Sequence, residues 1–335
     1  MTAKLIARIN DFPYFRPVRP GRRLIVRMDT TNHCNLRCTM CPMRLSDGDP
    51  DRKWKHMSSE VFETIRKEVF PAALTVAISC GAEPLANPEF GSHLRSLYKS
   101  GVPYRQMVTN GTLFSEETIR TVLAYPPTSL FFSIDGSSCK THASLRDGAD
   151  LNMILGVIEK LITGRGRRIF PMIGFSTTLQ RKNLCELADI VSLAHRAGAV
   201  SVGVVPLVPY EGLNTLEAVI DPTSAEATRE ISRARLRASQ QGIAFSLSSE
   251  ASDRRSAHPC PHLRSTVFID PNGSIFPCPY WNTGHPLGNI LDGFDNVWKS
   301  KGLERLRRGN FSEPDNCMRC PEVTGRTVEI RKARQ

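Results

Sequence analysis

Short runs of apolar and β-branched residues alternate with amphipathic stretches along the first two thirds of the chain. Four of these stretches have helical periodicity. Ser58 or Ser59 is the expected N-cap of the first, and Gly198 is a C-cap signal at the end of the last. The apolar runs predict six strands, and the expected elements are strands 24–30, 74–79, 105–109, 129–134, 169–178 and 200–208, with helices 57–70, 115–125, 151–162 and 183–198.

This alternation of strand and helix is typical of a parallel sheet in an α/β protein. A closed barrel of this kind has eight strands, whereas six are predicted here, so the expected fold is a partial (β/α)6, TIM-like barrel. Functional residues are expected in the loops that follow the strands. We expect a basic N-terminal arm at residues 1–22, the partial barrel at 23–245 and a small C-terminal domain at 250–335.

The C-terminal domain is expected to contain a β-hairpin and a helix. Pro271-Asn272-Gly273 lies between two short apolar runs, which is a strong hairpin signal. One helix is then predicted over residues 287–309, with apolar positions at Ile290, Phe294, Val297 and Trp298.

Length and hydropathy exclude several classes of protein. The chain has 335 residues, enough for a hydrophobic core without disulfides. It shows no apolar leader at its start and no run of 18 apolar residues that could span a membrane. We therefore expect a cytoplasmic protein with no membrane partner, in which the ten cysteines stay reduced.

Three cysteines lie close together after the first strand. Cys34, Cys38 and Cys41 form the pattern C-x3-C-x2-C. Reduced cysteines at such spacing are metal or redox ligands more often than structural residues. Zinc usually takes four protein ligands, often as two C-x2-C pairs, so it is the weaker interpretation. A four-iron cubane with one open iron accounts better for three thiolates.

This cysteine pattern, placed between a strand and a helix, resembles that of the radical S-adenosylmethionine (SAM) superfamily. The resemblance implies a [4Fe–4S] cluster whose open iron binds the amino and carboxylate groups of SAM. It also implies reductive cleavage of SAM to a 5′-deoxyadenosyl radical, which takes a hydrogen atom from the substrate. The electron would come from a partner such as flavodoxin or ferredoxin.

The same resemblance assigns SAM contacts to residues that follow the strands. Gly81-Ala82-Glu83-Pro84 resembles the GGEP segment that holds the SAM amino group, with alanine at its second glycine. Ser133 and Asp135 resemble the pair that contacts the ribose. Arg146 resembles the residue that meets the SAM carboxylate through a bidentate guanidinium. The other implied contacts are Asn110, Thr178, Asn183 and Val205, of which Val205 would contribute to an apolar face for adenine.

A second group of cysteines lies near the C-terminus. On spacing alone, four thiolates on a hairpin and a C-x2-C turn leave a zinc knuckle open. Beside a radical SAM core, however, the arrangement C-x12-G-x4-C…C-x2-C resembles the first half of a SPASM module, in the short form called a twitch domain. The resemblance implies a fully ligated auxiliary [4Fe–4S] cluster on Cys260, Cys278, Cys317 and Cys320.

Charge and resemblance point to different substrates. The net charge of +11 would suit nucleic acid, phosphorylated sugars or acidic peptides, but no RNA-binding module is readable. The layout resembles twitch enzymes of aminoglycoside pathways, so a sugar-like alcohol in antibiotic biosynthesis is the expected substrate. The alternatives are a SPASM-type peptide maturase and, outside enzymes, a regulator that binds clusters or zinc.

Cys185 is the candidate for a catalytic thiol. It opens the predicted helix after the fifth strand, at the expected active-site rim, and neither cluster needs it. Epimerisation requires a thiol that returns a hydrogen atom to the substrate radical, whereas dehydrogenation does not. We therefore expect a carbinol epimerase with Cys185 as donor, and an alcohol dehydrogenase as the alternative. The alternative is that Cys185 only packs in the first turn of this helix and has no catalytic role.

Overall fold

The computed structural model describes residues 21–46, 53–79, 81–209, 212–213, 215–248, 262–278 and 286–309. Within them, one curved sheet has the strand order β10-β9-β8-β1-β2-β3-β4-β5-β6-β7. Its parallel strands are β1 (Leu24–Met28), β2 (Ala73–Ile78), β3 (Tyr104–Thr109), β4 (Ser129–Ser133), β5 (Met172–Leu179), β6 (Ser201–Pro206), β7 (Ala244–Leu247) and β8 (Thr266–Ile269). Strands β9 (Ser274–Phe276) and β10 (Gly288–Asn289) add antiparallel pairs at one edge.

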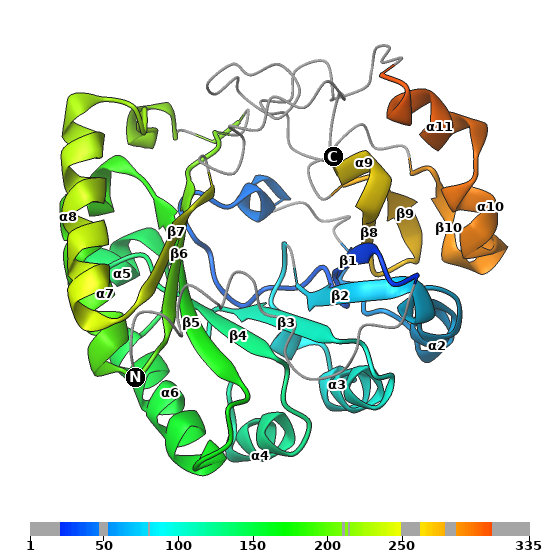
Figure 1. Cartoon of the computed structure of the whole chain (residues 1–335), viewed down its shortest axis with the longest axis horizontal. Helices are drawn as coiled ribbons and strands as arrows, with labels where there is room; N and C mark the ends of the chain where they lie inside the picture. Colours follow the sequence, from blue (N-terminus) through cyan, green and yellow to red (C-terminus); the bar gives the residue numbers. More distant parts are fainter. Residues whose placement is uncertain are drawn as a thin grey trace.

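Helices cover the convex side of this sheet (Figure 1). The longer ones are α2 (Ser59–Glu68), α3 (Phe90–Lys99), α4 (Glu116–Ala124), α6 (Leu151–Arg165), α7 (Leu187–Arg196) and α8 (Ala225–Gln241). The described chain also has shorter helices, of which η1 (Pro42–Ser46) lies inside the arc of the sheet. The others are α5 (Cys139–Leu145), α9 (His262–Ser265), α10 (Phe294–Trp298), α11 (Lys301–Arg307), η2 (Phe70–Ala72), η3 (Pro84–Ala86), η4 (Arg181–Glu186), η5 (Leu216–Ala218) and η7 (Ile290–Asp292). Ser58 caps α2, since its side chain accepts the Val61 N–H. None of the helices in the described ranges is long and apolar enough to cross a membrane.

The predicted open barrel is confirmed, and five of the six predicted strands match to within two residues. The exception is the fifth, which begins at Met172 rather than at residue 169. The predicted hairpin is present as β8 and β9, and the structure adds one unpredicted strand, β7, and an unpredicted parallel pairing of β8. Strand β7 extends the sheet beyond β6, and β8 pairs in parallel with β1.

The predicted helix over residues 287–309 is wrong. The chain there forms η7, α10 and α11 in succession. Gly293 has a φ of 94° and interrupts the helical backbone, and Ser300 begins a new helix by accepting the Leu303 N–H. The expected apolar positions are nevertheless used, because Ile290, Phe294 and Val297 are all buried.

One hydrophobic core joins the barrel to the C-terminal hairpin. Val26 and Met28 of β1 are fully buried together with Ile65 of α2 and with Val267 and Ile269 of β8. The two regions therefore share buried apolar surface as well as strand hydrogen bonds.

This shared core makes a prediction about stability. Ile269→Ala is expected to destabilise the whole chain by about 2–5 kcal/mol, because it leaves a cavity between β8 and the barrel. Urea unfolding measures the change. Ile169→Ala is the matched control, since Ile169 is 57% exposed and its loss should cost less than about 0.5 kcal/mol. Equal stability of the two variants would contradict a shared core.

Candidate active site

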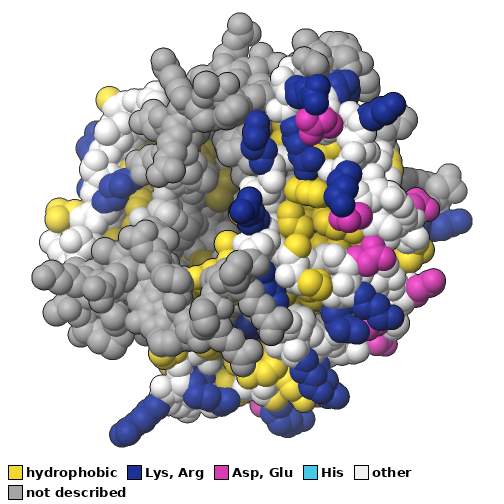
Figure 2. Space-filling model, turned by 45° about the vertical axis from the view of Figure 1, so that its right-hand side comes forward, with side chains coloured by type: hydrophobic (Ala, Val, Ile, Leu, Met, Phe, Trp, Pro, Cys, Tyr) yellow, Lys and Arg dark blue, Asp and Glu magenta, His cyan; other side chains and the backbone are white. Residues whose placement is uncertain are grey.

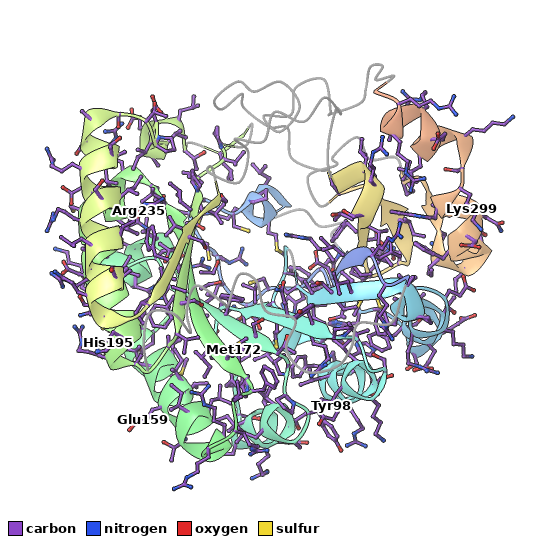
Figure 3. All side chains as sticks on the ribbon, in the orientation of Figure 1. Tyr98, Glu159, Met172, His195, Arg235 and Lys299 are labelled. Atoms are coloured by element: carbon purple, nitrogen blue, oxygen red, sulfur yellow. The ribbon has the colours of Figure 1, made fainter. Side chains whose placement is uncertain are left out.

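The three clustered cysteines lie on the concave side of the sheet. The loop that carries them runs from β1 to η1, the short blue helix inside the arc of Figure 1. Figure 2 shows a hollow in the molecule, with apolar side chains on its wall and lysines or arginines beside it. In contrast, Tyr98, Glu159 and His195 lie on the outer side of the helical layer (Figure 3).

A cavity of about 160 Å³ lies at the cysteine loop. Cys38 is buried, while Cys34 and Cys41 are half-buried. The cavity is lined by His33, Cys34, Asn35, Leu36, Arg37, Cys38, Cys41, Met43, Arg44 and Trp54. The three thiols therefore lie at one site, as the sequence pattern predicted. Trp54 also lies there, and nothing in the sequence predicted this.

The arrangement of the thiols fits a cluster better than a single zinc ion. Within the described ranges, no three His, Cys, Asp or Glu side chains converge closely enough to hold one metal ion. In a cubane each thiolate binds a different iron, so the sulfur atoms need not meet at one point.

Burial keeps the thiols of Cys34 and Cys38 protonated until a metal binds. It raises the pKa of Cys38 to about 11, although the Arg146 guanidinium acts in the opposite direction. Burial also raises the pKa of Cys34, partly offset by the backbone N–H of Leu36. Cluster assembly must therefore displace protons from the loop, and iron supplies the charge that makes the thiolates stable.

The loop after β2 is held by hydrogen bonds to its own backbone and to β1. Gly81 N–H donates to Asp29 Oδ1 at 3.1 Å, and the Ser79 hydroxyl donates to the Ala82 carbonyl at 2.5 Å. Ser79 has a φ of 79°, whereas Ala82 lies outside the left-handed region. Alanine is thus compatible with this position, as the sequence suggested. The sequence did not predict a role for Asp29, because this residue belongs to no recognisable motif.

Glu83 joins the loops after β2 and β3. Its Oε1 accepts from the Thr109 hydroxyl (2.7 Å) and the Leu85 N–H (3.1 Å), and its Oε2 accepts from the Asn110 N–H (2.7 Å). Burial raises the pKa of Glu83 to about 7, despite these donors. The carboxylate therefore fixes the two loops that border the cysteines.

Asn110 contacts the cysteine loop directly. Its amide Nδ2 donates to Asn35 Oδ1 at 3.0 Å and lies 3.8 Å from Cys34 Sγ. Its Oδ1 accepts from the Thr112 N–H at 2.9 Å. The structure thus gives Asn110 a contact with the loop that would hold the cluster.

Asp135 and Asn183 hold loops together where cofactor contacts were expected. Asp135 is fully buried, with Oδ2 paired to Arg146 Nε at 2.7 Å and Oδ1 accepting the Thr178 N–H at 2.7 Å. Asn183 is also fully buried, and its Nδ2 donates at 2.9 Å to the carbonyls of Asp135 and Thr178. Asn183 is saturated by protein groups, whereas Asp135 Oδ2 has an ion pair with Arg146 but no hydrogen bond to the described part of the chain. Both side chains connect neighbouring loops, which is a positioning role.

The other expected SAM contacts remain open to a ligand. Ser133, at the end of β4, is 8% exposed, and its hydroxyl makes no side-chain hydrogen bond with the part of the chain that the structure describes. Thr178 is half-buried on β5, and Val205, near the end of β6, is 40% exposed. All three lie at the carboxyl ends of adjacent strands, where the sequence placed them.

Cys185 lies on η4 and is exposed, but it does not line the cavity of the three cysteines. Its neighbour Glu186 accepts from the backbone N–H and the hydroxyl of Ser137, both at 2.8 Å. This attaches η4 to the loop after β4. Cys278 follows β9 and is half-buried beside Phe268 and Phe276. The other three predicted auxiliary ligands, Cys260, Cys317 and Cys320, lie outside the described residues.

Comparison with known families identifies both halves of the chain. The radical SAM superfamily model matches residues 28–194, and the model of the SPASM iron–sulfur cluster-binding domain matches residues 260–321. The chain carries a radical SAM domain followed by a SPASM domain. These domains imply one SAM-binding [4Fe–4S] cluster and an auxiliary cluster.

Curated relatives resemble the chain along most of its length. Mycofactocin maturase MftC of Mycobacterium tuberculosis is 23% identical over 303 residues, which are 87% of this chain and 73% of the maturase. The AdoMet-dependent heme synthase of Methanosarcina barkeri is 24% identical over 320 residues, 88% of each chain.

A solved structure confirms the fold. Streptococcus suis SuiB, bound to S-adenosylmethionine, superposes with a TM-score of 0.70 at 14% identity, covering 90% of this chain and 72% of that chain. These relatives do not support the expected resemblance to aminoglycoside-pathway enzymes.

Burial of Glu83 makes a prediction about pH. Its folded-state pKa, about 7, lies above the ordinary value of 4.5, so the native state binds the Glu83 proton more tightly than the unfolded state. The stability of the cluster-free protein relative to Glu83→Gln should be greatest below about pH 4.5 and fall as the pH rises through about 7. Urea unfolding across this range measures the difference.

Glu116→Gln is the control for this experiment. Lys160 lowers the pKa of the exposed Glu116 by hydrogen bonding. Its contribution should therefore have the opposite sign, being present above the ordinary pKa and lost as the pH falls. A Glu83 contribution that does not change with pH would contradict its burial as a carboxylate.

Proposed function

We propose that this protein is a radical SAM enzyme that modifies a peptide substrate. The observation that carries the proposal is the set of peptide-acting relatives that span both domains. MftC is a maturase, and SuiB has also been solved with its precursor peptide SuiA bound, with a TM-score of 0.70 over 90% of this chain. The proposal replaces the sugar-like substrate that the cysteine layout suggested.

The geometry of the site is compatible with a chain-like substrate. The sheet is open, because β7 and β10 stand at its two ends and are not paired with each other. Trp54, which is 46% exposed, lies against His33 with ring centroids 4.3 Å apart, at the edge of the cysteine cavity. Arg37 and Arg44 also line this cavity. An extended peptide with acidic side chains would match this basic and aromatic border.

In this proposal the residues have separate tasks. The thiolates of Cys34, Cys38 and Cys41 hold the SAM-binding cluster, and Glu83 and Asn110 fix the loops around it. When bound, SAM and the cluster would supply the radical chemistry that removes a hydrogen atom from the substrate. The remaining SAM contacts come from Gly81, Ser133, Thr178 and Val205, and the auxiliary cluster lies on Cys260, Cys278, Cys317 and Cys320.

Cys185 is a weaker candidate for a hydrogen-atom donor in this setting. It is exposed and does not line the cavity of the three cysteines. Its role, if the product requires a returned hydrogen atom, is tested by Cys185→Ala in deuterated buffer, where loss of solvent deuterium from the product would support the role. The exposed Cys139, also outside both predicted ligand sets, is the matched control.

A tetrapyrrole carboxylate is the second candidate substrate. The specific observation in its favour is the heme synthase of Methanosarcina barkeri, which aligns over 88% of both chains. Arginines at the cavity would suit propionate groups as well as acidic peptides. A radical SAM sugar epimerase or dehydrogenase has no comparable support.

Substrate-dependent SAM cleavage tests the proposal. The anaerobically reconstituted protein would be incubated with SAM, dithionite and either a candidate precursor peptide encoded beside its gene or an iron porphyrin with propionate groups. We expect 5′-deoxyadenosine formation to rise several-fold with the peptide, with a matching mass change in the peptide. Stimulation and mass change with the porphyrin alone would contradict the peptide assignment and favour the second candidate.

A further inference from the structure

The cysteine loop pairs with the segment after α5 in an antiparallel manner. The Arg37 N–H donates to the Asp147 carbonyl at 3.1 Å, and the Thr39 N–H donates to the Leu145 carbonyl at 2.9 Å. These two rungs run in opposite chain directions, so the residues between them lie opposite each other. Those residues are Cys38 and Arg146.

The side chains continue this pairing. Arg146 Nη1 lies 3.9 Å from Cys38 Sγ, and Arg146 Nε lies 2.7 Å from Asp135 Oδ2. The side chain of Arg146 is only 13% exposed, and that of Asp135 is fully buried. The Thr178 N–H holds the other carboxylate oxygen at 2.7 Å. A buried guanidinium therefore stands between a buried carboxylate and one of the three clustered thiols.

This geometry places two guanidinium nitrogens of Arg146 against protein groups. A bidentate contact uses two neighbouring N–H groups of the guanidinium, either Nε with one Nη or the two Nη groups together. Nε already faces Asp135, and Nη1 already faces Cys38. Each edge of the guanidinium thus has one nitrogen that faces a protein group, and the Nε–Asp135 contact is an ion pair without a hydrogen bond.

Few other charges act on this pair. The charged or titratable groups that face Cys38 are Arg146, the other two clustered thiols and Asp135. His142 also faces Arg146, but it is buried and accepts the Asp135 N–H at Nδ1. Burial lowers the pKa of His142 to about 4, so it is neutral at pH 7. Glu83 also acts on Arg146, and burial raises the pKa of both the Glu83 and the Asp135 carboxyl groups. One guanidinium and two buried carboxyl groups therefore lie beside the loop, where the low dielectric constant strengthens their interactions.

We propose that Arg146 is a positioning residue for the Cys38 thiolate, and that the Arg146–Asp135 pair sets the reduction potential of the SAM-binding cluster. The inference rests on the proposed function, because it requires that the three clustered cysteines hold that cluster. Reduction adds one electron from an external donor and breaks no bond. A positive charge and an N–H donor at a ligand sulfur stabilise the more negative reduced state and so raise the potential. Asp135 opposes this effect and holds the guanidinium in place.

An EPR-monitored redox titration of the SAM-free, reconstituted protein tests the proposal. Arg146→Gln removes the positive charge and should shift the potential of the SAM-binding cluster to more negative values. Asp135→Asn removes the negative charge and should shift it to more positive values. Arg146→Lys keeps the charge without the planar guanidinium and should shift it less than Arg146→Gln. The auxiliary cluster serves as an internal reference.

Arg168→Gln is the matched control. Arg168 donates from Nη1 to the Leu123 carbonyl, before β5, at the end of the barrel away from the cysteine loop. It should leave both potentials unchanged, with iron content equal to that of the unaltered protein in every variant compared. If Arg146→Gln takes up too little iron, the comparison of Asp135→Asn with Arg146→Lys still decides the sign of the shift in the reduction potential of the SAM-binding cluster.

Three results would overturn the proposal. The first is an unchanged SAM-free potential in Arg146→Gln together with weaker SAM binding, which would return Arg146 to the SAM carboxylate. The second is a shift of the same sign in Arg146→Gln and Asp135→Asn, as general disruption of the loop would produce. The third is an unaltered protein that binds only the auxiliary cluster, which would also remove the cluster assignment on which the proposal rests.

Discussion

The burial of a three-cysteine loop against the ends of a parallel sheet is the constraint on which the site depends. A thiolate in this position is costly without a compensating charge, and the raised pKa of Cys38, about 11, expresses that cost. Iron supplies most of the compensation when the cluster forms. The protein supplies the rest through Arg146, and it fixes the loop by backbone pairing with residues 145–147.

The same region connects the two domains. The Asp29 N–H donates to the Ile269 carbonyl of β8, and the Asp29 carboxylate accepts from the Gly81 N–H. One residue at the end of β1 therefore contacts both the first strand of the C-terminal hairpin and the loop expected to hold the SAM amino group. Because β8 also shares a buried core with β1, the SPASM domain is built onto the barrel sheet rather than linked to it loosely.

Local sequence patterns predicted the strands and the chemistry well, because both depend on nearby residues. Apolar runs identified six strands, and the spacing of Cys34, Cys38 and Cys41 indicated the cluster. The patterns did not predict that β8 would join β1, since that pairing spans more than half of the chain. The prediction of one helix over residues 287–309 was wrong, because it followed the apolar periodicity and ignored Gly293, which interrupts the helical backbone.

Roles that depend on burial also could not be predicted from the sequence. Asp135 and Asn183 occupy the expected positions after their strands, but only the structure shows that both side chains are fully buried and contact neighbouring loops. The pairing of Cys38 with Arg146 could not be read from residues more than a hundred positions apart. The relatives do not support the sugar-like substrate that the cysteine layout suggested. Cluster ligands determine how SAM is bound and do not specify what is modified.

Iron analysis combined with EPR tests the central claim most directly. The reconstituted protein should contain about eight irons per chain, and the Cys34→Ala, Cys38→Ala, Cys41→Ala triple variant about four. In the reduced, unaltered protein, SAM should change the EPR spectrum of one cluster, because it binds the open iron that three thiolates leave; the triple variant should show no such change. Eight irons and a SAM-sensitive spectrum in the triple variant would contradict the account.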